Sequence, residues 1–488
     1  MIPFFDSYLD NRGGSYVNYR TGMNTYEEAF ADGIYYAAGW LGSGYTPQQI
    51  IYGQVPRMNF RAFPNPSAFR IQIDGYELFS HWSFVSYEKQ SVDHGLHVTV
   101  CLHHEEARID LTVHTLLDGT GCLTRWLQIT DCAGKIRRVS EIGILSGGLQ
   151  ITPNPDLRLK NGTHLYRIGY MQGSNWGVEG GFAWHDLTGD GYSISGRFAR
   201  DRFRHPMFLL ENRASGETFV CQIGFSGGWR CDFDYIRDIN CSSSGDGLLE
   251  MRLCLDGHAP LATIPAHGTL VTPKVHFGMS YGGADEAIFM MHEHIRTSVI
   301  KHIAHWTAPI EVGLGPEMNM DIDGVMQSIE YAVKYGAEYF ILDCLWHAQP
   351  GHDQTPYDWI PHTERYAEGI KGIRDLCRQK GLKFGLWMEP ERSHSPNQPI
   401  LQVKEATANN YTMPKDCRHQ DGVLALSNDE LADYMYRMID EMITHYDIDL
   451  FRLDHNAFER AYHMEDDIQI YSDIRYFENL YRIFDKLR

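Results

Sequence analysis

Residues 338–389 read EYFILDCLWHAQPGHDQTPYDWIPHTERYAEGIKGIRDLCRQKGLKFGLWME, and this stretch decides the fold expected for the second half of the chain. It contains two short apolar runs, EYFILDC and KFGLWME, separated by the helical stretch GIKGIRDLCRQKG. PIEVGLG and MQSIEYAVKYG precede it, and ELADYMYRMIDEMITHY and IDLFRLD follow it. Strands that alternate with helices in this way predict a parallel sheet with crossover helices. Gly336 and Gly381 stand where glycine commonly ends a helix.

Acidic residues end several of these predicted strands. Asp343, Glu389 and Asp454 each close an apolar run, and Glu391 follows Glu389 by two residues. Functional side chains of parallel β/α barrels gather at the carboxyl ends of the strands, so repeated acids there predict an active site. We count about four β/α units before Arg488, whereas a closed barrel needs eight. We therefore expect the barrel to be incomplete within these residues.

The first half of the chain has a different pattern. From about Arg57 to Val275, short β-rich runs such as LHVTVCLHH and CLTRWLQITD are separated by Gly, Asp, Asn and Pro, which is typical of a β-sandwich. From Ala284 to Ile303 the apolar residues recur every three to four positions and predict a helix. We expect a sandwich domain at residues 1–283, a helical connector at 284–305 and the barrel segment at 306–488.

Composition narrows the classes of function. The 488 residues contain 43 Lys+Arg and 63 Asp+Glu, and the net charge of −20 argues against binding to nucleic acid. No apolar stretch is long enough to span a membrane, and the first residues lack the basic start of a signal peptide. Ten cysteines without metal-binding spacing fit a reduced compartment, so we expect a cytoplasmic protein with no metal and no cofactor.

Five strings in the second half carry a resemblance to a known family. They are LDCLWH from Leu342, YDW from Tyr357, FGLWMEPER from Phe384, CRHQDGVLALS from Cys417 and FRLDHN from Phe451. In order and spacing they resemble the signatures of glycoside hydrolase family 36, the α-galactosidase or melibiase group. The sandwich segment SISGRFARDRFRHPMFLLENRASGETFVCQIGFSGGWR resembles the same family. The resemblance implies a sandwich of the supersandwich type in front of a catalytic (β/α) barrel, and assembly into homo-oligomers.

Asp454 carries the sharpest functional hypothesis. A carboxylate at the end of a buried strand is placed to attack an anomeric carbon and form a glycosyl-enzyme intermediate. The resemblance implies the same role, because the family has its nucleophile at the matching Asp. The alternative is an Asp that caps the following helix or pairs with Arg452.

The resemblance also implies a set of residues that bind the sugar. Asp343 would accept a hydrogen bond from a sugar hydroxyl, Trp387 would offer its ring or its N–H, and Glu389 and Glu391 would support neighbouring arginines. The other substrate-binding candidates are Trp346, Asp358, Arg418, Arg452 and Asn456. Each has an ordinary structural alternative, such as core packing for Trp387 and a turn for Asn456.

Three residues depart from the family pattern. Cys344 stands where the family has a second carboxylate, Arg452 where it has Lys, and Leu453 where it has Trp. A thiol is a weak donor and a poor acceptor, so one strong contact to a galactose-like hydroxyl is missing. We expect these changes to relax or alter the sugar specificity.

The expected activity is that of a retaining exo-α-glycosidase acting on terminal α-galactosyl groups of oligosaccharides. The family takes its acid/base from a later barrel strand, beyond the point that corresponds to Arg488, so we assign no residue to that role. One alternative is a transglycosidase of the same family. Others are a sugar-binding protein without turnover, and a chain whose barrel segment does not fold.

Overall fold

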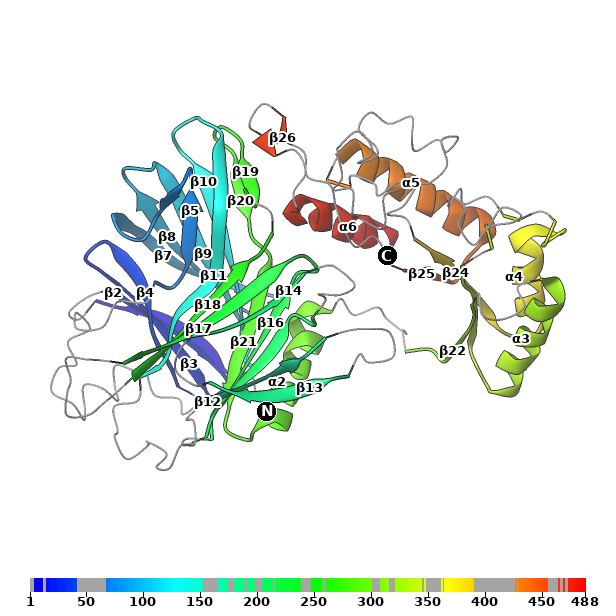
Figure 1. Cartoon of the computed structure of the whole chain (residues 1–488), viewed down its shortest axis with the longest axis horizontal. Helices are drawn as coiled ribbons and strands as arrows, with labels where there is room; N and C mark the ends of the chain where they lie inside the picture. Colours follow the sequence, from blue (N-terminus) through cyan, green and yellow to red (C-terminus); the bar gives the residue numbers. More distant parts are fainter. Residues whose placement is uncertain are drawn as a thin grey trace. The chain divides into compact units, whose positions relative to one another are not determined.

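The chain forms two compact units, Met1–Lys301 and His302–Arg488. The computed structural model describes residues 4–11, 15–41, 67–151, 166–173, 180–187, 191–197, 204–213, 216–237, 247–257, 260–300, 308–315, 321–344, 346–347, 361–362, 364–389, 426–427, 429–454, 464–465, 468–469 and 473–488. The first unit consists mainly of antiparallel strands, and the second contains a parallel sheet with helices (Figure 1).

One layer of the first unit is a ten-stranded sheet. Its order is β13-β12-β15-β16-β21-β10-β9-β8-β7, with β20 paired to β10. The strands are β7 (Trp82–Val92), β8 (Gly95–His104), β9 (Ile109–Leu117), β10 (Cys122–Asp131), β12 (Tyr166–Met171), β13 (Phe182–Asp186), β15 (Met207–Asn212), β16 (Thr218–Gly224), β20 (Thr269–Val271) and β21 (Lys274–Ser280). Along β8 and β9 every second side chain is buried, which confirms the alternation expected from the sequence.

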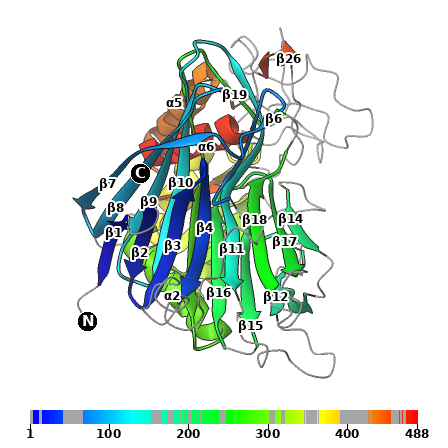
Figure 2. The same ribbon diagram turned by 90° about the vertical axis from the view of Figure 1, so that its left-hand side faces the viewer.

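The other layer combines two smaller sheets that meet at β4 and β11, and its strands lie beside one another in Figure 2. The first contains β1 (Phe5–Asp10), β2 (Ser15–Thr21), β3 (Asn24–Ala31) and β4 (Ile34–Leu41) in chain order. The second has the order β14-β17-β18-β11-β5-β6, with β19 paired to β11. Its strands are β5 (Arg70–Ile73), β6 (Tyr76–Glu77), β11 (Arg137–Ile151), β14 (Tyr192–Gly196), β17 (Trp229–Arg237), β18 (Gly247–Leu255) and β19 (Ala262–Ile264).

The four strands β1–β4 correct one expectation, because we placed the start of the strand-rich region near Arg57. Six consecutive residues of β3, Asn24–Ala29, are buried, and they include the polar residues Glu27 and Glu28. A strand that is covered on both faces does not alternate between apolar and polar residues. The usual sequence signal was therefore absent here.

A buried ion pair joins the two layers of the sandwich. Glu28 of β3 pairs with Arg125 of β10, and neither side chain is exposed. The hydroxyl groups of Tyr19, Tyr26 and Tyr35 also donate hydrogen bonds to Glu28, at 2.9, 2.9 and 2.6 Å. The carboxylate thus has several donors in place of water, which a buried charge requires.

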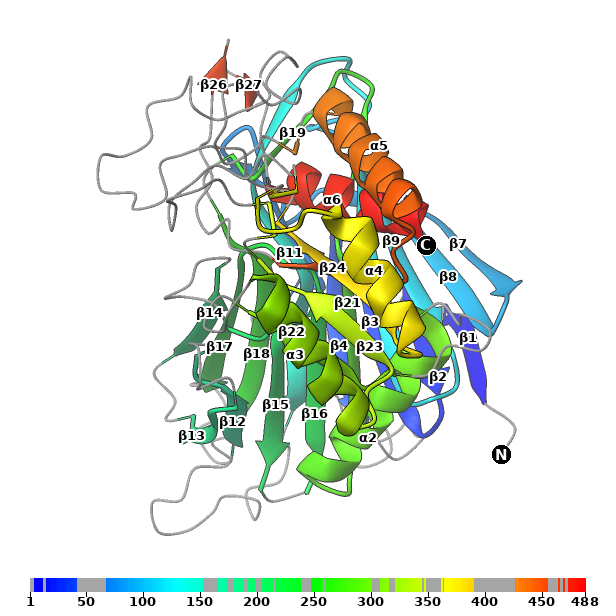
Figure 3. The same ribbon diagram turned by 90° about the vertical axis from the view of Figure 1, so that its right-hand side faces the viewer.

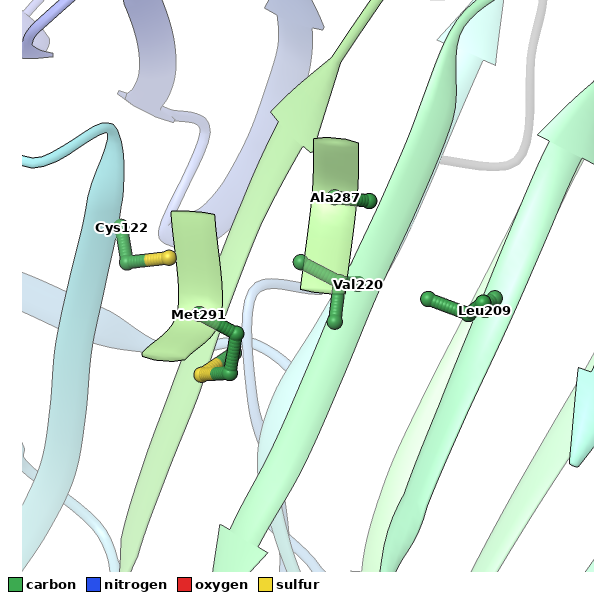
Figure 4. Close-up of a cluster of buried hydrophobic side chains, with 5 residues drawn as sticks. All are labelled: Cys122, Leu209, Val220, Ala287 and Met291. Carbon is green, nitrogen blue, oxygen red and sulfur yellow. The ribbon is translucent and has the colours of Figure 1, made fainter. Parts of the chain in front are cut away.

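A helix covers the outside of the ten-stranded sheet. It is α2 (Ala284–His294), which continues as the π-helix η3 (Ile295–Val299). Ala287 and Met291 of α2 pack against Cys122, Leu209 and Val220 of three strands (Figure 4). We expected this helix to extend to Ile303, but Ile300 is already in an extended conformation. The helix lies within the segment expected to connect the domains and packs on the first unit.

The second unit is built on a four-stranded parallel sheet with the order β22-β23-β24-β25. The strands are β22 (Glu311–Leu314), β23 (Tyr339–Leu342), β24 (Lys383–Met388) and β25 (Leu450–Leu453). The helices are α3 (Ile322–Lys334), α4 (Gly369–Gln379), α5 (Asp429–Tyr446) and α6 (Asp473–Leu487), and β26 (Met464–Glu465) pairs with β27 (Ile468–Gln469). Figure 3 shows α3 and α4 along one face of the sheet. This arrangement confirms the predicted alternation of strands and helices.

Local sequence explains where these helices begin and end. Asp321 precedes α3, and its side chain accepts a hydrogen bond from the amide of Gly324, as an N-cap does. Gly336 and Gly381 have φ angles of 75° and 80°, so they end α3 and α4 in the left-handed conformation that glycine allows. Among the described residues, no helix combines the length and the apolar character needed to cross a membrane.

Candidate active site

The register of the parallel sheet brings the predicted strand-end residues together. Ile341 of β23 lies beside Gly385 of β24, and Trp387 lies beside Arg452 of β25. Two backbone hydrogen bonds continue the ladder beyond the strands, from the Asp343 amide to Leu314 and from the Asp454 amide to Met388, both at 3.0 Å. They hold both acids at the carboxyl edge of the sheet.

Asp454 is half-buried and is oriented by the neighbouring strand. The indole N–H of Trp387 donates a hydrogen bond to Oδ2 of Asp454, and the two atoms are 3.2 Å apart. Trp387 is itself buried, with only 3% of its surface exposed. The indole therefore holds the carboxylate from within the sheet face, while Asp454 keeps part of its surface exposed.

Two aromatic side chains that follow β23 surround Trp387. The indole N–H of Trp346 donates to the main-chain oxygen of Trp387 at 2.7 Å. The ring of His347 is nearly parallel to that of Trp387, at an angle of 7° and a centroid distance of 6.1 Å. Burial lowers the pKa of His347 to about 3, so its imidazole is neutral near pH 7.

Asp343 is engaged on both carboxylate oxygens. Its Oδ1 accepts a hydrogen bond from the amide of Cys344 at 2.7 Å. Its Oδ2 lies 3.5 Å from a guanidinium nitrogen of Arg452, and the same nitrogen is 4.0 Å from Glu311. The Arg452 side chain is 44% exposed and extends from β25 towards Asp343 after β23 and Glu311 at the start of β22. Arg452 thus places a positive charge between two acids of neighbouring strands.

Of the remaining predicted site residues, one is described by the structure and four are not. Glu389 directly follows β24 and is fully buried. Asp358, Glu391, Arg418 and Asn456 lie outside the described residues. Within the described part of the chain, no group of three or more His, Cys, Asp or Glu side chains is arranged to hold a metal ion.

The sequence analysis predicted neither the position of His347 beside Trp387 nor the hydrogen bond from Trp387 to Asp454. His347 follows Trp346 in the string LDCLWH, but a lone histidine in an apolar string has no periodicity that marks it. The contact between Trp387 and Asp454 joins residues 67 positions apart. Only the pairing of β24 with β25 makes that contact visible.

Parts of the sequence are similar to known proteins. The family model described as Melibiase matches residues 269–488. An α-galactosidase from Escherichia coli is 24% identical over 366 residues, covering 68% of this chain and 48% of that protein. The chain spans less than half the length of the sequence relatives that it matches.

Solved structures share the fold over nearly the whole chain. An α-galactosidase from Lactobacillus brevis superimposes with a TM-score of 0.74 and 16% identity, covering 98% of this chain and 69% of that one. A raffinose complex of a variant of the family 36 α-galactosidase AgaA from Geobacillus stearothermophilus gives 0.77 and 16%, covering 97% of this chain and 70% of that one. The fold class expected from the sequence, a sandwich followed by β/α units, is confirmed.

The fold, a β-sandwich followed by β/α units whose strands end in acids, is shared with these solved α-galactosidases. The sequence comparisons add that residues 269–488 are similar to the Melibiase family and that relatives of lower than 30% identity are α-galactosidases.

Proposed function

We propose that this protein hydrolyses terminal α-galactosyl groups of oligosaccharides with retention of configuration, and that Asp454 is its nucleophile. The observation that carries the proposal is the partly exposed Asp454 carboxylate at the carboxyl edge of a parallel sheet, held by the Trp387 N–H at 3.2 Å. The match of residues 269–488 to the Melibiase family and the similarity to α-galactosidases support the reaction class. The raffinose bound in the AgaA variant supports the substrate class.

In the proposed first step, an Asp454 oxygen attacks the anomeric carbon and the bond from that carbon to the aglycone oxygen breaks. The bonding electrons go to the aglycone oxygen, which is protonated by a general acid. We assign no residue to this acid. In the second step water attacks the anomeric carbon, loses a proton and releases the Asp454 carboxylate, which leaves the sugar with its original configuration. If a sugar hydroxyl attacks in place of water, the same intermediate gives transglycosylation.

Asp343 and Arg452 are proposed to bind the sugar beside Asp454. The register places them in the same row across the sheet, on either side of Trp387, and they already contact each other at 3.5 Å. A hydroxyl that bonds to Asp343 would share this carboxylate with Arg452 and with the Cys344 amide. We therefore expect Asp343 to bind that hydroxyl more weakly than two carboxylates without such partners would.

The exchange of a family carboxylate for Cys344 favours a second candidate, which is a sugar-binding protein without turnover. The experiment that separates the two uses an aryl α-galactoside whose leaving group needs no protonation. Asp454→Asn keeps the size of the side chain and removes the nucleophile, and we expect a loss of at least about 10³-fold in kcat. Measurable galactose binding without release of the phenol would instead support the binding protein.

A covalent intermediate is tested directly with a fluorinated α-galactosyl substrate that reacts fast and hydrolyses slowly. We expect the intact mass to rise by one fluorosugar and the label to lie on the peptide that contains Asp454. The matched control is Asp447→Asn at the other end of β25. Asp447 has a φ of 54°, which Asn accepts, and its carboxylate is exposed on the surface. This control should react like the parent protein, and a label on any other peptide would refute the role of Asp454.

A further inference from the structure

The aromatic side chains around Trp387 form a connected unit that ends on Asp454. Trp346 and Trp387 are buried, with 0% and 3% of their surfaces exposed, and His347 is buried to the same degree at 3%. They come from two chain segments, since Trp346 and His347 follow β23 whereas Trp387 belongs to β24. Buried groups in contact with one another restrict one another's positions.

Hydrogen bonds run through this unit in one direction. Trp346 donates its N–H to the main-chain oxygen of Trp387 at 2.7 Å. Trp387 donates its own N–H to Asp454 at 3.2 Å. The first bond holds the backbone of Trp387 and the second orients the carboxylate, so a displacement of Trp346 is passed on to Asp454 through a single residue.

His347 completes the unit by packing. Its ring is parallel to that of Trp387 within 7° and meets the ring of Trp346 edge to face, at 87° and 5.1 Å. Both geometries are favourable for aromatic pairs. Because burial keeps the imidazole neutral, the ring lies against the indole without the cost of a buried charge.

We propose that Trp346 and His347 are positioning residues for Asp454, acting through Trp387. The inference rests on the proposed function of Asp454 and goes further, because it gives Trp387 the task of holding the carboxylate in place of stacking on the sugar. The Trp387 ring is buried and parallel to the His347 ring, and its N–H is directed to Asp454. Misplacement of a reacting group by about 1 Å costs about 10²-fold in rate, so such support has a measurable effect.

Three variants remove one link each. Trp387→Phe keeps an aromatic ring and removes the donor to Asp454, and we expect kcat to fall by about 10- to 100-fold with little change in KM. Trp346→Phe and His347→Ala should lower kcat by smaller factors, again with little change in KM.

His347→Phe is the conservative variant, because phenyl keeps the ring stack, and it should retain the parent kcat. Trp184→Phe, on β13 of the sandwich, is the matched control for the loss of an indole and should behave as the parent. Unfolding midpoints of all variants show whether a loss of rate reflects a loss of fold. A rise in KM with unchanged kcat in Trp387→Phe would overturn the proposal in favour of direct sugar contact.

A second measurement tests the same inference in a protein that does not turn over the galactoside. Nitrogen-15 labelling of tryptophan gives one indole N–H signal per residue, and Trp387→Phe identifies that of Trp387. We expect this signal to shift in Asp454→Asn, because the acceptor of the Trp387 N–H is changed, and to shift more in His347→Ala than in His347→Phe. If the Trp387 signal does not change in Asp454→Asn, the positioning role is refuted. If the signal does change but the protein does not turn over the galactoside, only the proposed function is refuted.

Discussion

Loss of the buried partner of Arg125 should destabilise the sandwich strongly. The perturbation is Glu28→Gln, which keeps the size of the side chain but removes the negative charge. Arg125 is fully buried, and within the described part of the chain its guanidinium also donates to the main-chain oxygen of Ala68, at 3.5 Å. Removing one partner of a buried ion pair costs about 3–5 kcal/mol, because the remaining charge has no solvent to replace it.

The magnitude can be read from thermal unfolding followed by near-ultraviolet circular dichroism and calorimetry. For domains of 150–250 residues a loss of 1 kcal/mol lowers Tm by about 2–4 °C. The first unit is somewhat larger, so we expect its transition to fall by about 10 °C. The transition of the second unit, resolved by calorimetry, should stay where it is.

The control is Glu77→Gln, which breaks the half-exposed pair with Arg70 and should cost at most about 1 kcal/mol. A double-mutant cycle with Arg125→Met isolates the pairwise energy, and the double variant should lose less than the sum of the single variants. A change below about 1 kcal/mol in Glu28→Gln would refute the reasoning, since it would mean that the Arg125 charge reaches water or another acid.

Three further predictions concern the second unit. An unfolded histidine titrates near its ordinary pKa of 6.5, whereas burial lowers the pKa of His347 to about 3. Between these pH values the unfolded state binds more protons than the folded state, so the free energy of unfolding should fall on acidification by about 1.4 kcal/mol per pH unit. His347→Phe removes this titration and should make the free energy of unfolding less dependent on pH. Cys344→Asp supplies the second carboxylate of the family and should raise kcat/KM for an aryl α-galactoside about 10-fold. An unchanged kcat/KM would show that this position does not contact the sugar. Gly336→Ala should cost about 1 kcal/mol in urea unfolding because its φ is 75°. Among the described residues, apart from the two chain neighbours, no atom lies within 4 Å of an added Cβ, so a much larger loss would contradict a purely conformational origin.

The parallel strands were predictable because their residues are buried on both faces and read as continuous apolar runs. Phe340, Leu342, Phe384 and Leu386 all have no exposed surface, as the runs EYFILDC and KFGLWME imply. The same property hid β3, where Glu27 and Glu28 are buried as well. A buried acid with partners on distant strands leaves no signal in local sequence.

The candidate site divides in a similar way. Strand ends marked Asp343, Glu389 and Asp454 in advance, because a parallel sheet has its functional edge where its strands finish. No local pattern could show that Arg452 lies 3.5 Å from Asp343, or that Trp387 donates to Asp454. Those contacts join separate β/α units, and they depend on the register between strands.

For the second unit, the amino-acid sequence by itself determined the kinds of element, the order in which they occur and the acids at the ends of the strands, because helix and strand periods and glycine stops are local properties. Tertiary structure alone decided which of these acids are held by a donor, which is paired with an arginine and which aromatic rings surround Trp387. The physical reason is that hydrogen bonds and ring contacts act over a few ångströms between residues that strand pairing brings together from distant parts of the chain.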